Sequence, residues 1–154
     1  MKTVVITGST RGIGFGLAKE FISRGCAVLV SGRSQEGVDT SVDALGNLFP
    51  SAQIAGFPCD VTDMAQIEKL WDSAVDAFGS VDIWINNAGI GHPQESAWEM
   101  SESTVRKVVD VDLLGLVFGT QVAVRGMLRQ GHGQVYNMEG FGSDGAVRAG
   151  MSVY

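Results

Sequence analysis

Short apolar runs alternate with segments of helical periodicity along the whole chain. Five runs rich in β-branched residues predict strands over residues 3–7, 27–31, 52–57, 81–86 and 133–138. Between these runs, apolar residues recur at intervals of three or four, which is typical of helices that bury one face. The first predicted helix follows the first strand and ends at Arg24. The second spans Glu36 to Leu48, the third includes Ile67 to Phe78, and the fourth runs from Ser101 to Gln130.

This alternation of strands and helices predicts the fold class. Strands that are separated by helices are joined by right-handed crossovers, which make the strands parallel and place helices on both faces of the sheet. We therefore expect an α/β fold with a doubly wound parallel sheet of the Rossmann type, formed by residues 1–154 as a single domain. Residues 139–154 predict no helix, so we expect the last strand to be uncovered and the domain to lack its C-terminal strands and helices.

Composition and charge exclude several classes of partner. The formal net charge is −6, and the basic residues form no block, so a nucleic acid or an anionic membrane surface is not expected to bind. The N-terminus lacks the apolar stretch of a signal peptide. The longest uncharged stretch, residues 113–124, is shorter than the roughly 20 residues that cross a bilayer. We expect a cytoplasmic protein.

The two cysteines predict buried thiols, and a disulfide or a metal pair is the weaker alternative. Cys26 and Cys59 lie in separate apolar segments, far apart in the sequence. We expect reduced, buried thiols that pack as small apolar side chains, and no metal ion.

A glycine-rich loop, "TGSTRGIG" at residues 7–14, connects the first strand to the first helix. Gly8 permits a tight turn, and the missing side chains of Gly12 and Gly14 would let a pyrophosphate approach the amides at the helix N-terminus. A turn that serves packing alone would use the same glycines, so the loop leaves both interpretations open. A P-loop is excluded, because no Lys-Ser/Thr pair follows the glycines.

The end of the second strand bears on the choice of cofactor. An acidic side chain at this place accepts hydrogen bonds from the ribose of NAD, but the sequence here is Ser31-Gly32-Arg33, without a carboxylate. Arg33, together with Arg11 of the glycine loop, would suit the 2′-phosphate of NADP, because a guanidinium offers phosphate two parallel donors. We favour NADP over NAD; the alternative is that Arg33 is a solvated surface residue.

Four motifs occur in the order typical of one enzyme family. They are "TGSTRGIG", "CDVTD" at 59–63, "NNAG" at 86–89 and "DVDLLG" at 110–115. With them the chain resembles the short-chain dehydrogenase/reductase family of classical type over essentially its whole length. The stretch "NMEGFGSDG" after the last strand is similar to the chlorophyll b reductase-type members. The resemblance implies reversible hydride transfer between a nicotinamide cofactor and a small carbonyl or alcohol substrate.

The resemblance also implies roles for individual residues. Asp60 and Val61 would line the adenine, and Asn87, Ala88 and Gly89 would support the cofactor and the central sheet. The remaining cofactor contacts are expected from Gly8, Ser9, Arg11, Gly12, Ile13, Gly14 and Arg33. Family members usually dimerise through the long helix, so residues 101–130 are expected to pack against a second copy.

The catalytic residues implied by the resemblance are Tyr154, Ser143 and Asp112. Tyr154 matches the tyrosine of the Tyr-x-x-x-Lys pair; a phenol with a pKa near 10 is only about 0.1% ionised at pH 7 and needs a nearby cation to act as a base. That lysine would follow the last residue given. Ser143 would polarise the substrate carbonyl, or is an ordinary serine of a turn, and Asp112 stands where the family usually has Asn. A second hypothesis is therefore a nucleotide-binding fragment without catalytic activity.

Overall fold

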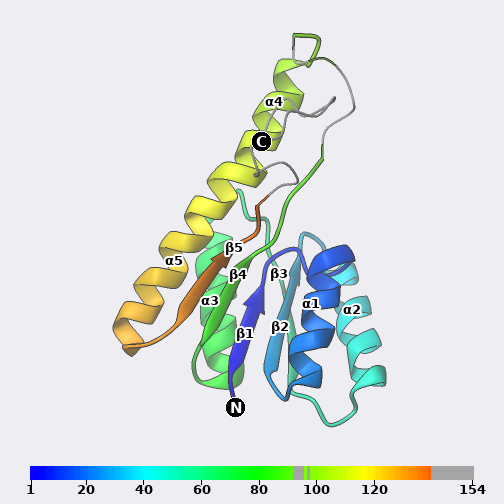
Figure 1. Cartoon of the computed structure of the whole chain (residues 1–154), viewed down its shortest axis with the longest axis vertical. Helices are drawn as coiled ribbons and strands as arrows, with labels where there is room; N and C mark the ends of the chain where they lie inside the picture. Colours follow the sequence, from blue (N-terminus) through cyan, green and yellow to red (C-terminus); the bar gives the residue numbers. More distant parts are fainter. Residues whose placement is uncertain (92–95, 97, 140–154) are drawn as a thin grey trace.

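A five-stranded parallel sheet forms the centre of the molecule (Figure 1). The computed structural model describes residues 1–91, 96 and 98–139. The strand order is β3-β2-β1-β4-β5, so the chain winds outward from β1 in both directions. The predicted doubly wound sheet is confirmed. The strands are β1 (Thr3–Ile6), β2 (Ala27–Gly32), β3 (Ile54–Pro58), β4 (Ile83–Asn86) and β5 (Gln134–Asn137).

Helices cover both faces of this sheet (Figure 1). Because successive strand residues point to opposite faces, Val5 belongs to one core cluster, whereas Val4 and Ile6 belong to the other. The cluster with Val5 includes the buried residues of α3 (Met64–Phe78) and α5 (Gly115–Gln130). The cluster with Val4 includes Ala18 and Ile22 of α1 (Gly12–Ser23) and Leu45 of α2 (Gln35–Leu48).

The long helical segment differs from its prediction in one respect. The expected helix over residues 101–130 consists of α4 (Glu102–Val108), a π-helical segment (Val109–Leu114) and α5. A π-helix closes its hydrogen bonds over one more residue than an α-helix, and apolar periodicity does not reveal such a short change. In Figure 1, α4 extends beyond the carboxyl ends of the strands.

Three glycines let α5 lie close to the sheet and to α3. A Cβ atom at Gly115 would lie 2.7 Å from Cγ2 of Val61. At Gly119 a Cβ would overlap Asn86, and at Gly126 it would overlap the indole of Trp71. Part of the high glycine content therefore serves helix packing, because a side chain at these positions would push α5 away from the core.

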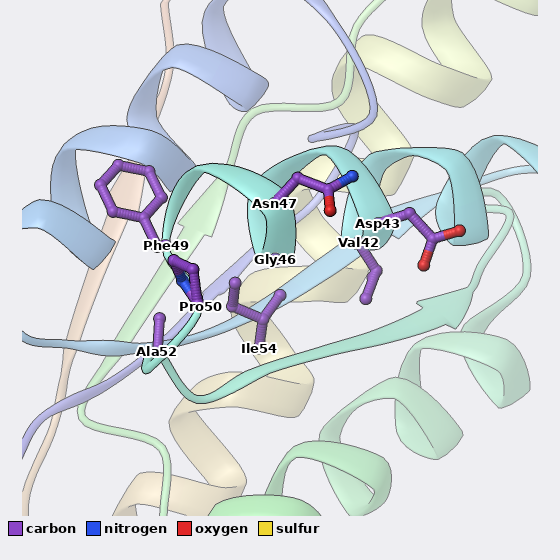
Figure 2. A pocket seen from close by; sticks show the side chains of 8 residues that line it. All are labelled: Val42, Asp43, Gly46, Asn47, Phe49, Pro50, Ala52 and Ile54. Carbon is purple, nitrogen blue, oxygen red and sulfur yellow. The ribbon is translucent and has the colours of Figure 1, made fainter.

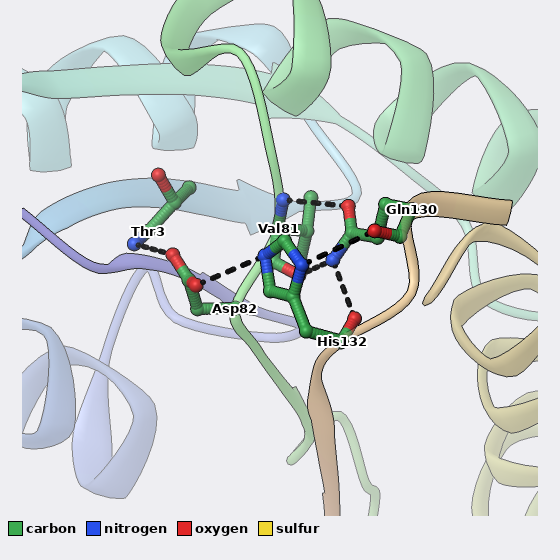
Figure 3. A network of polar contacts seen from close by, with 5 residues as sticks. All are labelled: Thr3, Val81, Asp82, Gln130 and His132. Atoms are coloured by element: carbon green, nitrogen blue, oxygen red, sulfur yellow. Dashed lines mark hydrogen bonds and ion pairs between the residues drawn. The ribbon is translucent and has the colours of Figure 1, made fainter. Parts of the chain in front are cut away.

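Polar contacts hold the start of β5 at the amino edge of the sheet (Figure 3). Gln130 Nε2 donates to the carbonyl oxygens of Val81 (2.6 Å) and His132 (2.7 Å). Asp82 accepts from the backbone N–H of Thr3 at 2.8 Å, and its other oxygen lies 3.4 Å from Nε2 of His132. The turn from α5 into β5 is thus fixed against β1 and β4.

One face of β5 is open in the part of the chain that the structure describes. Val135 packs against the core cluster beneath α3 and α5. Tyr136 points the other way, pairs in register with Ile85, and is 52% exposed. Among the described residues no helix covers this face of β5, as the sequence predicts (Figure 1).

Candidate nucleotide-binding site

The candidate site lies at the carboxyl ends of β1, β2 and β4. The glycine loop follows β1, and the loop of Asn86 to Gly89 follows β4, the neighbouring strand. β2 lies on the other side of β1, so the chain leaves the sheet in opposite directions at this place. Crevices at such switch points are where open parallel sheets bind their ligands.

Asn87 joins the two loops. Its Nδ2 donates to the carbonyl oxygens of Thr7 (2.9 Å) and Gly8 (3.0 Å). In return, Thr7 Oγ1 accepts from the backbone N–H groups of Asn87 and Ala88, each at 3.0 Å. Gly8 has a φ of 63°, and a Cβ there would lie 2.7 Å from Cα of Ala88. The loops can approach this closely only with glycine at position 8.

Gly14 also makes room for the contact between the glycine loop and Asn87. A Cβ on Gly14 would lie 2.5 Å from Asn87 Nδ2 and 2.5 Å from the carbonyl oxygen of Gly8. Gly14 therefore permits a close approach within the protein, and its expected contact with a cofactor stays a prediction. Gly12 differs, because a Cβ there would meet nothing within 4 Å.

The open part of the glycine loop is Arg11 to Ile13. Arg11 and Gly12 are exposed, and Ile13 is 68% exposed. Arg11 is the N-cap of α1, yet its side chain makes no capping hydrogen bond. The first N–H groups of a helix have no partner within the helix, and a helix N-terminus without a side-chain cap is suited to bind an anion.

Ser9 connects the glycine loop to the ends of two strands. Its Oγ donates to the carbonyl oxygen of Ile6 at 2.7 Å and accepts from the N–H of Ser31 at 2.9 Å. Its own N–H donates to the carbonyl oxygen of Ser31 at 2.7 Å, and the residue is fully buried. The polar groups of Ser9 thus join the ends of β1 and β2, and its expected contact with the cofactor stays a prediction.

Arg33 lies next to the glycine loop. A Cβ on Gly32 would lie 2.6 Å from Cγ2 of Thr10, so the end of β2 packs tightly against the residue that precedes Arg11. Arg33 is exposed. None of the ion pairs found among the described residues involves Arg11 or Arg33. Within the described residues, neither guanidinium group therefore has an ion-pair partner that would compete with an anion.

The "CDVTD" motif forms the turn between β3 and α3. Asp60 Oδ1 accepts from the N–H and the hydroxyl of Thr62, at 3.0 and 2.8 Å. Val61 is 8% exposed and lies beneath Gly115 of the long helical segment. The Asp60 carboxylate thus holds this turn, which follows the strand beside β2.

Asp63 caps α3, a role that the sequence analysis missed. Its Oδ1 accepts from the N–H of Ala65 at 2.9 Å, and its Oδ2 accepts from Nε2 of Gln66 at 3.0 Å. The Gln66 side chain, with smaller contributions from the N–H groups of Ala65 and Gln66, lowers the pKa of Asp63. Asp followed three residues later by Gln is the sequence signal of a capping box.

Cys59 is protected from ionisation. It is 3% exposed, and burial raises the pKa of its thiol to about 12, with the nearby Asp60 and Asp63 adding to the effect. The prediction of a buried apolar thiol is confirmed for Cys59, whereas Cys26 is only half-buried.

Asp112 is the one predicted catalytic residue that the structure describes. It lies in the π-helical segment, and its Oδ1 accepts from the backbone N–H of Ile90 at 2.8 Å. This bond ties the long helical segment to the loop that follows β4. Gly89 lies in that loop, next to Ile90, and is exposed. Ser143 and Tyr154 lie outside the described residues.

Asn86, the first residue of "NNAG", is a buried residue whose side chain bonds to several elements, and it was not among the predicted site residues. Its Oδ1 accepts from Nε1 of Trp84 at 2.7 Å. Its Nδ2 donates to Oγ1 of Thr120 (3.0 Å) and to Oδ1 of Asn137 (2.7 Å). Asn86 therefore fixes the carboxyl ends of β4 and β5 against α5.

A hollow of about 380 Å³ lies away from this site, between the second half of α2 and the start of β3 (Figure 2). Asp43 and Asn47 supply its polar side chains, and the other lining residues are Val42, Gly46, Phe49, Pro50, Ala52 and Ile54. It lies at the amino end of β3, opposite to the glycine loop. No helix in the described part of the chain is long and apolar enough to cross a membrane.

A glycine loop at a switch point of a parallel sheet is the arrangement at which Rossmann-type folds bind dinucleotides. The chain belongs to the short-chain dehydrogenase family, whose model matches residues 2–154. The family expected from the motifs is thus confirmed.

Two curated relatives give more detail than the family as a whole. A probable chlorophyll(ide) b reductase of Arabidopsis thaliana, named as chloroplastic, is 37% identical over 99% of this chain and 34% of its own length. The predicted likeness to chlorophyll b reductases is therefore found. An NADP-dependent 3-hydroxy acid dehydrogenase of Escherichia coli is 33% identical over 88% of this chain and 52% of its own length.

A solved actinorhodin polyketide ketoreductase with NADPH has a TM-score of 0.87 at 30% identity, over 98% of this chain and 58% of that one. The chain thus spans about a third to about half the length of the two curated relatives.

Proposed function

We propose that the protein is an NADP-dependent oxidoreductase that transfers a hydride between the nicotinamide and a small carbonyl or alcohol substrate. The observation that carries this proposal is the N-terminus of α1, where the N-cap Arg11 makes no capping bond and where, within the described part of the chain, neither Arg11 nor the nearby Arg33 forms an ion pair. The names of the Escherichia coli relative and of the ketoreductase structure also mention NADP or NADPH.

The residues present fit such a cofactor. The free N–H groups at the start of α1 would hold the pyrophosphate, and Arg11 and Arg33 would pair with the 2′-phosphate. Asp60 and Val61 would line the adenine, while Gly89 and Ile13 would border the cofactor at the end of β4 and at the glycine loop. When bound, the nicotinamide supplies or accepts the hydride.

The acid/base chemistry falls to Tyr154. Its phenol would donate a proton to the substrate oxygen during reduction and take it back during oxidation. Ser143 would polarise the substrate carbonyl, and Asp112 would hold the adjoining loop through Ile90. A second function, nucleotide binding without turnover, is favoured by one observation: Asp112 offers Ile90 a carboxylate where the family usually has an amide.

Cofactor binding is tested by NADPH and NADH fluorescence titrations of the chain. We expect NADPH to bind at least tenfold more tightly, because charge-assisted hydrogen bonds to a phosphate contribute about 1.5–3 kcal/mol. Arg33→Asp should remove this preference, whereas Lys19→Asp, the same charge change on the exposed side of α1, should not. Equal affinities of the parent for the two cofactors would refute the NADP assignment.

Catalysis is tested by NADPH oxidation with a panel of ketones, for the chain and for a form extended to the length of its relatives. We expect turnover that Tyr154→Phe abolishes while the Kd for NADPH stays unchanged. Nucleotide binding without turnover in both forms would instead support the second function.

We also propose that the protein self-associates through the long helical segment. Leu113 (56% exposed), Val117 (36%), Val124 (40%) and Leu128 (76%) follow one another at intervals of four or seven residues, so they share the side that faces away from the sheet. Exposed apolar stripes of this kind mark protein interfaces. The expected cytoplasmic location stays a prediction, since one relative is named as chloroplastic.

A further inference from the structure

Ser41 belongs to α2, outside the glycine loop, yet its side chain reaches that loop. The residue is 3% exposed, and the single hydrogen of its hydroxyl is shared between the carbonyl oxygens of Gly37 (2.8 Å) and Thr10 (3.0 Å). The bond to Gly37, four residues back, is the one that a serine within a helix often makes. The bond to Thr10 spans 31 positions and connects α2 to the residue that precedes Arg11.

A second contact holds Thr10 against the end of β2. A Cβ on Gly32 would lie 2.6 Å from Cγ2 of Thr10, so the threonine methyl group occupies the space that this glycine leaves open. Gly32 is the last residue of β2, and Arg33 follows it directly. Thr10 is therefore held on two sides, by α2 through its carbonyl group and by β2 through its methyl group.

These two contacts determine where both guanidinium-bearing side chains begin. The peptide between Thr10 and Arg11 is planar and trans, so the direction of the Thr10 carbonyl also sets the direction of the Arg11 N–H. Arg33 is followed directly by Ser34, the N-cap of α2. Both arginines thus start from backbone that is tied to α2 and to the end of β2, and the contacts of Thr10 set how far apart they lie.

We propose that Ser41 is a positioning residue that adapts this site to a nucleotide with a 2′-phosphate. The inference rests on the NADP-dependent function proposed above. Ser41 itself does not touch the cofactor; it keeps Arg11 close enough to Arg33 for both to bind one phosphate group. Hydrogen bonds weaken steeply when donor and acceptor are misaligned, so a shift of Arg11 costs affinity for this phosphate. NADH lacks the phosphate, so its binding depends little on Ser41.

The other part of the glycine loop is held without Ser41. Asn87 Nδ2 donates to the carbonyl oxygens of Thr7 (2.9 Å) and Gly8 (3.0 Å), and Gly14 packs closely against the same side chain. These contacts fix the start of α1, where the pyrophosphate of either cofactor would bind. Loss of the Ser41 hydroxyl should therefore weaken the contacts to the 2′-phosphate and leave the rest of the nucleotide site in place.

Ser41→Ala tests this role, with fluorescence titrations of NADPH and NADH as the measurement. We expect the Kd for NADPH to rise about three- to tenfold and the Kd for NADH to change by less than about twofold. Thr40→Ala is the matched control, because Oγ1 of Thr40 donates to the carbonyl oxygen of Glu36 at 2.8 Å, also four residues back on α2, without a bond to the loop. This control should leave both Kd values unchanged.

The ratio of the two Kd values separates positioning from a loss of stability, because partial unfolding would weaken the binding of both cofactors by the same factor. Circular dichroism shows whether Ser41→Ala folds. If it does not, Gly32→Ala, whose methyl group would displace Thr10 from the other side, should show the same change in ratio. A parent that binds both cofactors equally overturns the proposed NADP dependence and this inference with it. A parent that prefers NADPH, together with a folded variant of unchanged ratio, overturns the role of Ser41 alone.

Discussion

Individual polar side chains at the site divide into those that hold the protein together and those that remain free. Asn87, Thr7 and Ser9 direct their polar atoms to the backbone of neighbouring strands and loops. Buried polar groups without such partners would cost free energy, so these bonds are needed for the loops to lie so close. Arg11 and Arg33 remain exposed. We therefore expect a ligand to be contacted mainly by the residues that make few internal contacts.

The buried thiol of Cys59 gives a prediction at this scale. A thiolate is the reactive form, and burial keeps the pKa of Cys59 at about 12. We expect iodoacetamide at pH 8 to label the half-buried Cys26 in the folded protein and to label Cys59 only after unfolding. Mass spectrometry of peptides from the parent and from Cys26→Ala measures this. Rapid labelling of Cys59 in native protein would contradict the burial.

Asp63 gives a prediction on pH dependence. Its pKa in the folded protein lies below the usual 3.8, so the stabilisation is present above about pH 4 and is lost as pH falls through the folded-state pKa. The variant Asp63→Asn keeps a capping oxygen but cannot titrate. We expect the parent to have the higher Tm at pH 7 and the difference to shrink below pH 4. A difference in Tm that does not change with pH would contradict the role of the charge.

At the scale of elements, α5 is positioned by residues that lack side chains. Gly115, Gly119 and Gly126 place its backbone against Val61, Asn86 and Trp71. The same contact brings Thr120 within hydrogen-bond distance of Asn86 and Asn137. The position of α5 thereby determines where β5 ends, and β5 leads directly to the segment that carries Ser143 and Tyr154.

Replacement of Gly126 tests this packing. A methyl group there overlaps the Trp71 indole, so Gly126→Ala should lower the free energy of unfolding by about 1–3 kcal/mol. Gly46→Ala is the matched control, because its methyl group meets nothing within 4 Å on α2 and should stabilise by about 0.5–1 kcal/mol. Urea denaturation measures both. Equal stability of Gly126→Ala and the parent would show that α5 can shift without cost.

At the scale of the whole molecule, the two proposed functions fall on different surfaces. The carboxyl edge of the sheet carries the candidate nucleotide site, and the outer side of the long helical segment carries the exposed apolar stripe. The sheet and the helices α3 and α5 separate these surfaces (Figure 1). Substitutions on the outer side should therefore leave nucleotide binding intact.

Leu128→Asp tests this separation. Leu128 is 76% exposed, so a charge there should not disturb folding, but it would be costly to bury in an interface. We expect loss of the dimer in size-exclusion chromatography with light scattering, and an unchanged Kd for NADPH. A dimer that persists in Leu128→Asp would place the interface elsewhere on the surface.

Local pattern was enough to predict much of this protein. Apolar periodicity predicted the order of strands and helices, and β-branched runs predicted the parallel sheet. The order of four motifs predicted the family. The position of Gly8 in a tight turn and the exposure of Arg33 after β2 also agree with the sequence analysis. These features depend on residues within a few positions of one another, so the sequence determines them directly.

Only the tertiary structure decided which contacts the motif residues make within the protein. Gly14 and Ser9, which were expected at the cofactor, have close neighbours that lie far away in the sequence: Asn87, 73 positions away, and Ser31, 22 positions away. The side chain of Asn86 bonds to residues as far as 51 positions away. Asp112, which accepts a hydrogen bond from Ile90, lies in a π-helical segment that apolar periodicity does not reveal. Such contacts arise when separate elements pack together, and a pattern along one chain does not encode the distance between them.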